Sequence, residues 1–231
     1  MRIFRKAATE STNIDARGGE PGDVFTADYQ SAGRGRLDHD WHSAKGENLT
    51  FSVVLSGGGR PPAEIATLPL VVGLAVVKAL KPFAALSLKW PNDVIAGGRK
   101  LAGILCERHG DNVIAGIGLN VNQTAFPPEI SGRATSLALL CGGAQDRASV
   151  LDRVLASLFS LHARWLSEGF ASLLGELDAV DCLKGRMLSV RQTDDDAAPV
   201  AGVCGGIAPD GALIVGGRAV YAGEAHIGDL P

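Results

Sequence analysis

The sequence contains few cysteines, and none of them are spaced for a metal site or a redox pair. Four are present in 231 residues, at Cys106, Cys141, Cys182 and Cys204. Chains that depend on disulfides or on thiolate-bound zinc carry cysteines in pairs at short, recurring spacings. We therefore expect four reduced thiols, which are typical of a cytoplasmic protein.

The sequence also lacks an excess of basic residues. Lysine and arginine number 22 and aspartate and glutamate number 25, which gives a formal net charge of −3. Proteins that bind nucleic acid without sequence preference normally carry a basic excess. The balance argues against that class, but it leaves room for a basic pocket that binds a small anion.

Long apolar runs are missing as well. The longest, at 68–80, has about a dozen residues, whereas a helix that spans a membrane needs about 20. The first 17 residues begin with basic side chains but contain no apolar centre, so they do not form a secretory leader. We expect no membrane association.

The composition that remains is that of a globular protein with a substantial core. Apolar residues make up 46% and charged residues 20% of the chain, which is near the average for soluble domains. The patterns predict strands over 24–27, 49–55, 86–90, 101–107 and 113–119, and helices over 61–80 and 147–177, the second broken at Gly169. His162 lies within the apolar stripe of that helix, which predicts a core histidine.

Beyond residue 184 the pattern changes to short strands. They are predicted over 187–191, 200–207, 212–215 and 219–222, with an acidic turn over 193–196. About 45 residues of short strands indicate a small β-barrel that packs on the main domain. The predicted domains are therefore 1–183 and 184–231.

The first polar segment that a purely structural role does not explain follows the strand at 24–27. It reads Tyr29-Gln30-Ser31-Ala32-Gly33-Arg34-Gly35-Arg36. Glycine lets the backbone approach a ligand and expose its N–H groups, and a guanidinium binds phosphate or carboxylate through two hydrogen bonds. The segment is either an anion-binding loop or a surface loop with solvated arginines. It lacks the third glycine and the helix of a Rossmann fingerprint.

A second segment reads Lys89-Trp90-Pro91-Asn92-Asp93-Val94 and leads to Arg99-Lys100. Proline keeps the preceding residue out of the helical region, and Asn92-Asp93 favours a turn. An amide and a carboxylate at such a turn suit Mg²⁺ and phosphate oxygens. Lys100 lies where the next strand begins, so it is either a solvated strand-end lysine or a point charge that reaches into a site.

A third segment, 113–122, is a strand that contains Gly116 and Gly118. Residues two apart share a face of a strand, and glycine inside a strand commonly marks close approach by a ligand or by another backbone. Asn120 is the next residue on that face. The strip is either a floor for a flat ligand or a site of tight sheet packing.

Taken together, these segments resemble the biotin–protein ligase family. The resemblance rests on five motifs in order: S-T-N at 11–13, Y-Q-S-A-G-R-G-R, K-W-P-N-D, R-K-L-A-G-I-L and G-I-G-L-N-V-N. It covers essentially the whole chain. It implies an α+β fold with a mixed sheet flanked by helices, related to class II synthetases, and a small C-terminal SH3-like β-barrel.

The resemblance also implies a reaction in two steps. Biotin and ATP, with Mg²⁺, form biotinyl-5′-adenylate and pyrophosphate, and the biotinyl group then passes to a lysine of a biotin carboxyl carrier domain, as in acetyl-CoA carboxylase. The biotin carboxylate must approach the α-phosphate, and two anions repel unless cations lie between them. The matching catalytic residues are Lys100 and Arg36, whose role would be to neutralise charge in the transition state.

Further roles follow from matching positions. The implied biotin contacts are Ser11, Thr12, Asn13, Gln30, Gly33, Arg34, Gly35, Arg36, Lys100 and Gly116. The implied ATP contacts are Arg36, Trp41, Asn92, Asp93, Lys100 and Asn120, and Asp93 would also hold Mg²⁺ through the ATP phosphates. Ser11-Thr12-Asn13 is in addition a plausible helix cap, and the two roles are compatible.

The chain departs from the family pattern in one place. Many members continue the arginine loop with G-R-x-W, whereas this chain has Asp38-His39-Asp40-Trp41. The loop has thus lost one glycine and one arginine and gained two carboxylates, which weaken the local positive potential unless they face solvent or help to bind metal. The sequence therefore leaves open how this loop closes over an adenylate.

The implied partners are biotin, ATP and the carrier domain. The resemblance is to the short form of the family without an N-terminal DNA-binding domain, so we expect no nucleic acid or membrane partner and a monomer or homodimer. One alternative is a lipoate or octanoyl ligase or transferase of the same superfamily. Octanoyl transferases need a nucleophilic cysteine, and Cys106 lies shortly after Lys100. A second alternative is a non-catalytic biotin-binding protein.

Overall fold

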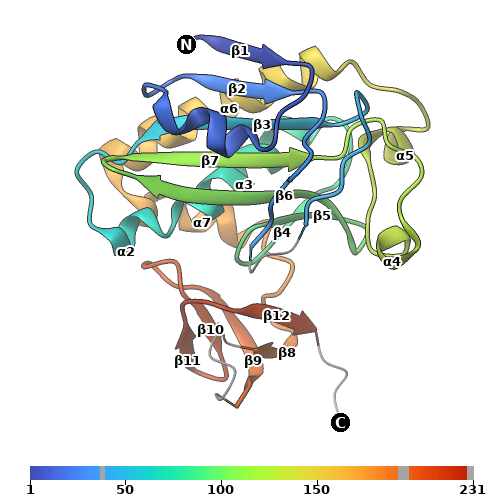
Figure 1. Ribbon diagram of the computed structural model, residues 1–231. Helices are drawn as coiled ribbons and strands as arrows, with labels where there is room; N and C mark the ends of the chain where they lie inside the picture. The colour runs from blue at the N-terminus through green and yellow to red at the C-terminus, as the bar shows by residue number, and fades with distance from the viewer. Residues whose placement is uncertain (37–39, 192–197, 228–231) are drawn as a thin grey trace.

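The computed structural model describes residues 1–36, 40–191 and 198–227 (Figure 1). Its main sheet has seven strands in the order β1-β2-β3-β7-β6-β5-β4. The strands are β1 (Ile3–Lys6), β2 (Val24–Ala27), β3 (Leu49–Ser56), β4 (Ser87–Lys89), β5 (Asp93–Ala96), β6 (Arg99–His109) and β7 (Asn112–Leu119). Only the β1–β2 pair is parallel among these, so the sheet is mixed, as predicted.

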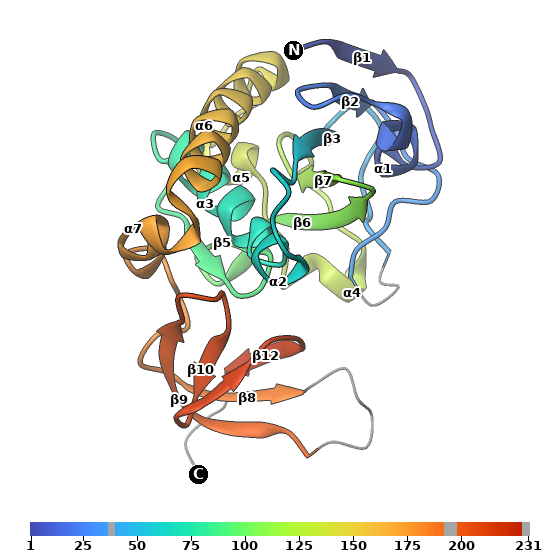
Figure 2. The same ribbon diagram turned by 90° about the vertical axis from the view of Figure 1, so that its left-hand side faces the viewer.

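Helices cover both faces of this sheet. Figures 1 and 2 show α3 and α6 on one face and the short α1 on the other. The helices are α1 (Thr12–Asp15), α2 (Pro62–Ile65), α3 (Leu68–Leu80), α4 (Pro128–Ser131), α5 (Leu137–Cys141), α6 (Arg147–Glu168) and α7 (Leu174–Asp178), with 3₁₀ turns at Ala16–Gly18 and Phe170–Leu173. The face that carries α1 is left largely free for a site.

The long helix α6 illustrates how the sequence determines an element. Asp146 caps its first turn by accepting hydrogen bonds from the N–H groups of Ala148 and Ser149, as N-cap residues do. Its apolar stripe is buried against the sheet and α3, and the helix ends at Gly169, where φ is 77°. The predicted break at this glycine is confirmed.

His162 lies within that stripe, as predicted for a core histidine. It is 7% exposed, its ring stacks on Trp165, and its Nε2 lies 2.9 Å from the Ser56 carbonyl oxygen. Burial lowers the pKa of His162, and the hydrogen bond to Ser56 acts in the opposite direction. The ring is therefore held neutral, with Nε2 as its donor.

The helical segment Pro62–Leu80, which includes α2 and α3, is long and apolar enough to cross a membrane by length and composition. Most of it, 72%, is buried inside the protein, and α3 packs on α6, β4, β5 and β6. The core helix of a globular protein has the same composition because it is surrounded by apolar side chains. Its burial accounts for its apolar character.

Five further strands form a second sheet below the first, in the order β11-β10-β9-β8-β12 (Figure 1). They are β8 (Met187–Arg191), β9 (Val200–Ile207), β10 (Leu213–Val215), β11 (Arg218–Val220) and β12 (Glu224–Ile227). Within the described residues no pairing joins β11 to β12, so this sheet is consistent with an SH3-like barrel but is not closed. The acidic turn predicted over 193–196 lies outside the described residues.

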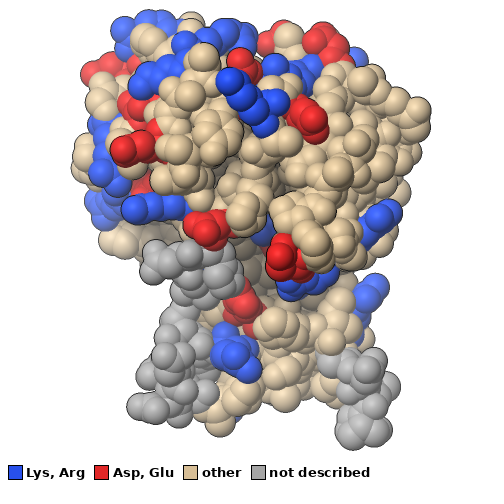
Figure 3. All heavy atoms as spheres, turned by 45° about the vertical axis from the view of Figure 1, so that its right-hand side comes forward, with Lys and Arg blue, Asp and Glu red and all other residues tan. Residues whose placement is uncertain are grey.

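The C-terminal strands and the main part of the chain meet through turns and the connecting segment. The Trp90 indole N–H donates to the Gly211 carbonyl at 3.1 Å, and Leu88 of β4 bridges to Asp181 in the connecting segment. α7 ends at Asp178 and β8 begins at Met187, and the domain boundary at 183/184 stays a prediction. On the face in Figure 3, the basic and acidic side chains of the described residues are interspersed over both parts.

Candidate functional site

Two rows of residues cross the free face of the main sheet. Antiparallel register places Ser52, Gly116 and Leu105 in one row and Thr50, Gly118 and Gly103 in the next. Residues two apart along a strand lie about 7 Å apart on the same face. The polar and charged residues that the sequence singled out gather over these two rows.

The first row lies under the S-T-N segment. Thr12 and Asn13 of α1 are almost completely buried, and the Ser52 hydroxyl oxygen lies 2.7 Å from Thr12 Oγ1 and 2.6 Å from Asn13 Oδ1. Ser11 is the N-cap residue of α1, but its side chain makes no capping hydrogen bond. The capping role proposed for its hydroxyl is therefore wrong.

Gln30 joins this row from the arginine loop. Its Oε1 accepts a hydrogen bond from the Thr12 backbone N–H at 2.8 Å and lies 3.1 Å from Thr12 Oγ1. Because Oε1 faces Thr12, the side-chain N–H₂ group of Gln30 faces the opposite way. A Cβ atom on the nearby Gly33 would lie 3.2 Å from that group.

Glu107, at the end of β6, completes the row on its far side. The Asn13 amide donates to the Glu107 carboxylate at 2.5 Å and, at 3.4 Å, to the Leu105 carbonyl. A Cβ atom on Gly116 would lie 2.2 Å from Asn13 Oδ1. Glycine at this position therefore allows Asn13 to approach the strand closely, so the strip is occupied by a side chain and is not bare.

Trp41 covers the second row. A Cβ atom on Gly118 would lie 2.2 Å from the Trp41 indole ring, and one on Gly103 would lie 3.2 Å from it. The ring also lies beneath Lys100, whose Nζ is 5.7 Å from the ring centroid. The indole Nε1 is buried and has no hydrogen-bond partner among the described residues, so it is an unused donor.

Lys100 and Asp93 meet beside this indole. Lys100 Nζ lies 2.7 Å from Asp93 Oδ1, and both side chains are partly exposed, at 38% and 22%. Asp93 Oδ1 makes no hydrogen bond within the described part of the chain, so its contact with Lys100 is a close ion pair without good hydrogen-bond alignment. The register between β5 and β6 shifts beside Lys100, a bulge that redirects the lysine.

Arg36 reaches the same place from the arginine loop. Burial lowers the pKa of Arg36, and the negative charges of Asp93 and Glu224 act in the opposite direction. Its Nη1 donates to the Gly223 carbonyl of the second sheet at 3.4 Å. Two cations from different segments thus interact with the charge of one carboxylate, Asp93.

Other predicted residues lie at the edge of this arrangement. Arg34 is exposed and its backbone bridges to Asp40, whereas Gly35 is partly buried. The Asn92 amide donates to the Ile104 carbonyl at 2.7 Å, so one of its hydrogens is used within the sheet. Asp38 and His39, part of the departure from the family pattern, lie outside the described residues.

Asn120 is better placed to bind a ligand. It is 3% exposed, its amide donates to the Thr135 carbonyl at 3.0 Å, and its Oδ1 has no hydrogen-bond partner in residues 1–36, 40–191 and 198–227. The Thr135 backbone N–H donates to the Lys100 carbonyl. A carbonyl oxygen without a partner and the Asp93 carboxylate are the hard oxygen donors that Mg²⁺ prefers. No group of three metal-binding side chains occurs in the described part of the chain.

Cys106 has the wrong environment for a nucleophile. Burial, helped by the charge of Glu107, raises the pKa of its thiol to about 12. The thiolate is the reactive form of cysteine, and at neutral pH this side chain is almost entirely thiol. All four cysteines are free.

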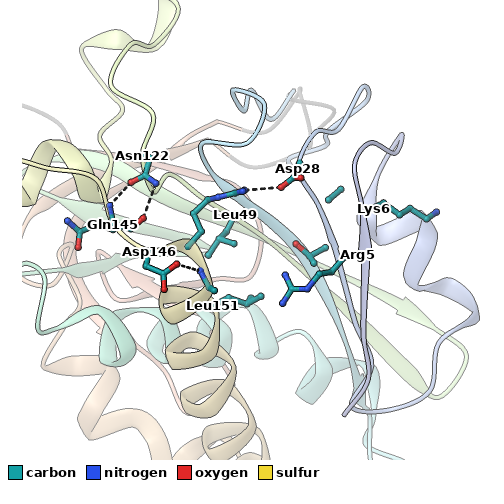
Figure 4. Close-up of a pocket in the computed structure, with 12 residues that line it drawn as sticks. Arg5, Lys6, Asp28, Leu49, Asn122, Gln145, Asp146 and Leu151 are labelled. Atoms are coloured by element: carbon teal, nitrogen blue, oxygen red, sulfur yellow. Dashed lines mark hydrogen bonds and ion pairs between the residues drawn. The ribbon is translucent and has the colours of Figure 1, made fainter.

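A hollow of about 510 Å³ lies elsewhere, between the start of α6 and the β1–β2 edge (Figure 4). No predicted site residue lines it. Arg147 at its rim makes an ion pair with Asp28 and donates to the Asn48 carbonyl, each at 3.1 Å. Asp28 and Asn48 flank the segment 29–47, so the contacts of Arg147 join the two ends of the arginine loop.

Comparison with known proteins agrees with this arrangement. The family model described as the biotin/lipoate A/B protein ligase family matches residues 6–123, which carry most of the two rows. This chain belongs to that family. It is 34% identical to the biotin--[acetyl-CoA-carboxylase] ligase of Paracoccus denitrificans over 92% of the chain and 93% of the relative. The biotin/lipoate ligase fold, expected from the motifs, is thus confirmed.

The chain is also similar to a longer curated relative and to a solved structure of this family. The chain is 35% identical to the bifunctional ligase/repressor BirA of Bacillus spizizenii over 73% of its own length, and it spans about half, 54%, of that relative. It superposes on the biotin protein ligase from Aquifex aeolicus in complex with biotin and ATP with a TM-score of 0.86 and 29% identity, over 97% of each chain.

The sequence did not predict several residues of the candidate site. Ser52, Glu107 and Thr135 were not singled out, nor was the contact that the second sheet makes through Gly223. Ser52 gave no usable signal, because it is one of two small polar residues, with Thr50, in the predicted strand 49–55. Glu107 and Thr135 gave none, since their importance depends on tertiary contacts.

Proposed function

We propose that this protein activates biotin with ATP and transfers the biotinyl group to a lysine of a biotin carboxyl carrier domain. In the first step a biotin carboxylate oxygen bonds to the α-phosphorus, and the bond to the β-phosphate breaks to release pyrophosphate. In the second, the lysine amine attacks the acyl carbon, AMP leaves and the amine loses a proton. Biotin–protein ligases among the relatives carry the same activity in their names.

One observation carries this proposal: the two cations lie one row along the sheet from a row of small polar groups. Arg36 and Lys100 both interact with Asp93. Asp93 is level with the second row, about 7 Å along the strand from the first row, over which Thr12 and Asn13 lie. A ligand with a polar ring at one end and a carboxylate at the other fits such a pair of rows. Biotin has this form.

In this arrangement the ureido ring lies beside Thr12 and Gln30, and the carboxylate reaches the cations. Lys100 and Arg36 exchange Asp93 for the biotin carboxylate and the α-phosphate, whose mutual repulsion they offset. Trp41 provides an apolar cover and an unused N–H group over the second row. Ser11, Gly33, Arg34 and Gly35 belong to the walls of the biotin site.

ATP and Mg²⁺ bind beside this junction in the proposal. Asp93 and the Asn120 carbonyl oxygen would hold the metal together with the ATP phosphates, and Asn92 would help to place the nucleotide. When bound, Mg²⁺ would offset phosphate charge during pyrophosphate release. The unpartnered Asn120 Oδ1 supports this placement.

Further parts of the proposal concern the surroundings of the enzyme. A cytoplasmic location is supported by four free cysteines. We propose a carboxylase carrier domain as acceptor, no nucleic acid or membrane partner, and a monomer or homodimer as the working form.

The structure disfavours one of the competing functions. A family member that transfers octanoyl groups through a cysteine needs a reactive thiolate, and the raised pKa of Cys106 removes the nearest thiol from that role. A lipoate ligase would not need the polar row of Thr12, Asn13 and Ser52, because the far end of lipoate offers no hydrogen-bonding ring.

Lys100→Ala tests the proposal at its catalytic centre. We expect biotin-dependent exchange of labelled pyrophosphate into ATP to fall by about 10²–10³-fold, because one of the two cations at the junction is lost. Lys81→Ala, at the exposed C-cap of α3, is the matched control and keeps wild-type exchange. Unchanged exchange in Lys100→Ala would remove this residue from the chemistry.

A further inference from the structure

The contacts in the first row require more hydroxyl hydrogens than the side chains possess. Three oxygen–oxygen contacts are present: Ser52 to Asn13 at 2.6 Å, Ser52 to Thr12 at 2.7 Å, and Thr12 to Gln30 at 3.1 Å. Ser52 and Thr12 supply one hydroxyl hydrogen each. One of the three contacts therefore lacks a hydrogen, and the direction of the others depends on how the two amides are turned.

Glu107 determines the orientation of the Asn13 amide. A carboxylate only accepts hydrogen bonds, so the atom of Asn13 that lies 2.5 Å from Glu107 must be the N–H₂ group. The Leu105 carbonyl on the same side is a second, much longer contact of that N–H₂ group, at 3.4 Å, so Glu107 is the dominant acceptor. The other atom, Oδ1, must then receive the hydrogen of Ser52, because it cannot donate one.

The hydrogen of Thr12 then has two possible acceptors. Ser52 Oγ lies 2.7 Å from Thr12 Oγ1 and already donates its own hydrogen to Asn13 Oδ1. Gln30 Oε1 lies 3.1 Å from Thr12 Oγ1 and already accepts a hydrogen bond from the Thr12 backbone N–H. The shorter contact needs a hydrogen to be attractive. Thr12 therefore donates to Ser52, and the hydrogen bonds run in one direction from Thr12 through Ser52 and Asn13 to Glu107.

We infer that Glu107 is a positioning residue that makes the Thr12 hydroxyl oxygen a hydrogen-bond acceptor for a ring N–H group of the ligand. With its hydrogen committed to Ser52, Thr12 Oγ1 presents only lone pairs to the site. This inference rests on the proposed function and deepens it. It states that the site distinguishes a cyclic urea from a ring of the same shape that lacks the N–H group.

A neutral or truncated side chain at position 107 no longer fixes the direction of the hydrogen bonds from Thr12 through Ser52 to Asn13. In Glu107→Gln the new amide can present either its oxygen or its N–H₂ group to Asn13, so the Asn13 amide can adopt both orientations. When it turns over, its N–H₂ group donates to Ser52, Ser52 donates to Thr12, and the Thr12 hydrogen becomes available to an acceptor on the ligand.

The test compares biotin with the two cyclic carbamates in which oxygen replaces one or the other ring N–H group. Calorimetric dissociation constants are measured for the wild type, Glu107→Gln and Glu107→Ala. Asp111→Asn, which removes a charge at the exposed β6–β7 turn, is the matched control. Circular dichroism and thermal melting show whether each variant is folded, and Glu107→Gln is close to isosteric.

For the wild type and Asp111→Asn we expect biotin to bind about 10–100-fold more tightly than the carbamate that places oxygen against Thr12. In Glu107→Gln we expect biotin to bind up to about tenfold more weakly and this preference to fall to about threefold or less. In Glu107→Ala we expect a larger loss of biotin affinity and the same loss of preference for biotin over that carbamate. A purely structural role would weaken all ligands alike and leave the ratio unchanged.

An unchanged preference in folded Glu107→Gln, with a wild type that binds biotin, would overturn this inference alone. A wild type that fails to bind biotin would overturn the proposed function, and this inference with it.

Discussion

Close contacts at single glycines determine how the site residues lie. Gly116 and Gly118 have negative φ angles, so neither is required by the backbone conformation. Their importance is the space that they leave for Asn13 and Trp41. The sequence predicted close approach to this strip by a ligand or another backbone, whereas two side chains of the chain itself occupy it.

Gly116→Ala should therefore damage the biotin site without unfolding the protein. The new methyl group would lie 2.2 Å from Asn13 Oδ1, so the Asn13 amide must move and its contact with Ser52 breaks. We expect biotin affinity, measured by calorimetry, to fall about 10–100-fold.

The matched control is Gly175→Ala in α7. A Cβ atom there has no neighbour within 4 Å, and alanine favours a helix, so biotin affinity stays as in the wild type. Equal affinity in the two variants would contradict the account of Gly116.

Charged residues were easier to predict than their partners. Lys100 and Arg36 follow from motifs, and the structure brings both to Asp93. Glu107 and Ser52 look like ordinary strand residues, because only the packing of α1 on the sheet reveals their hydrogen bonds. Residue types at fixed spacing are visible in a sequence, whereas contacts between residues 92 or 94 positions apart are not.

Among the elements, those with strong periodicity were predicted best. The helix α6, its end at Gly169 and the strands β3, β6 and β7 match the predicted ranges closely. The strands β1 and β12 were missed because each is a short edge strand with exposed residues. β5 was taken for a turn, since Asn92-Asp93 favours turns locally and pairing with β6 overrides that preference.

The packing of α6 makes stability depend on pH. Burial lowers the pKa of His162 in the folded protein, whereas in the unfolded chain it is about 6.5. The unfolded state thus binds more protons below about pH 6.5, and the free energy of unfolding falls as the pH drops through that value toward the lower folded pKa.

Chemical denaturation at about pH 7.5 and about pH 5.5 measures this contribution. We expect the wild type to lose more stability between the two than His162→Gln, whose amide can still donate to the Ser56 carbonyl. An equal loss in the two proteins would show that His162 is not responsible.

For the whole molecule, the position of the second sheet connects it to the site. Gly223, just before β12, accepts a hydrogen bond from Arg36, and Trp90 of the K-W-P-N-D motif donates to Gly211. The sequence predicted a small all-β appendage, but not its contact with the arginine loop. That contact depends on how two distant segments of the chain pack, which local sequence patterns do not encode.

The central claim is that the two rows on the free face of the main sheet bind biotin and activate it for transfer. The most direct test is transfer of labelled biotin to an isolated biotin carboxyl carrier domain, with and without ATP and Mg²⁺, beside a lipoyl domain supplied with lipoate or octanoate. The account predicts labelling of the biotin carrier alone, and only with ATP. Labelling of the lipoyl domain, or tight binding of biotin without transfer, would contradict it.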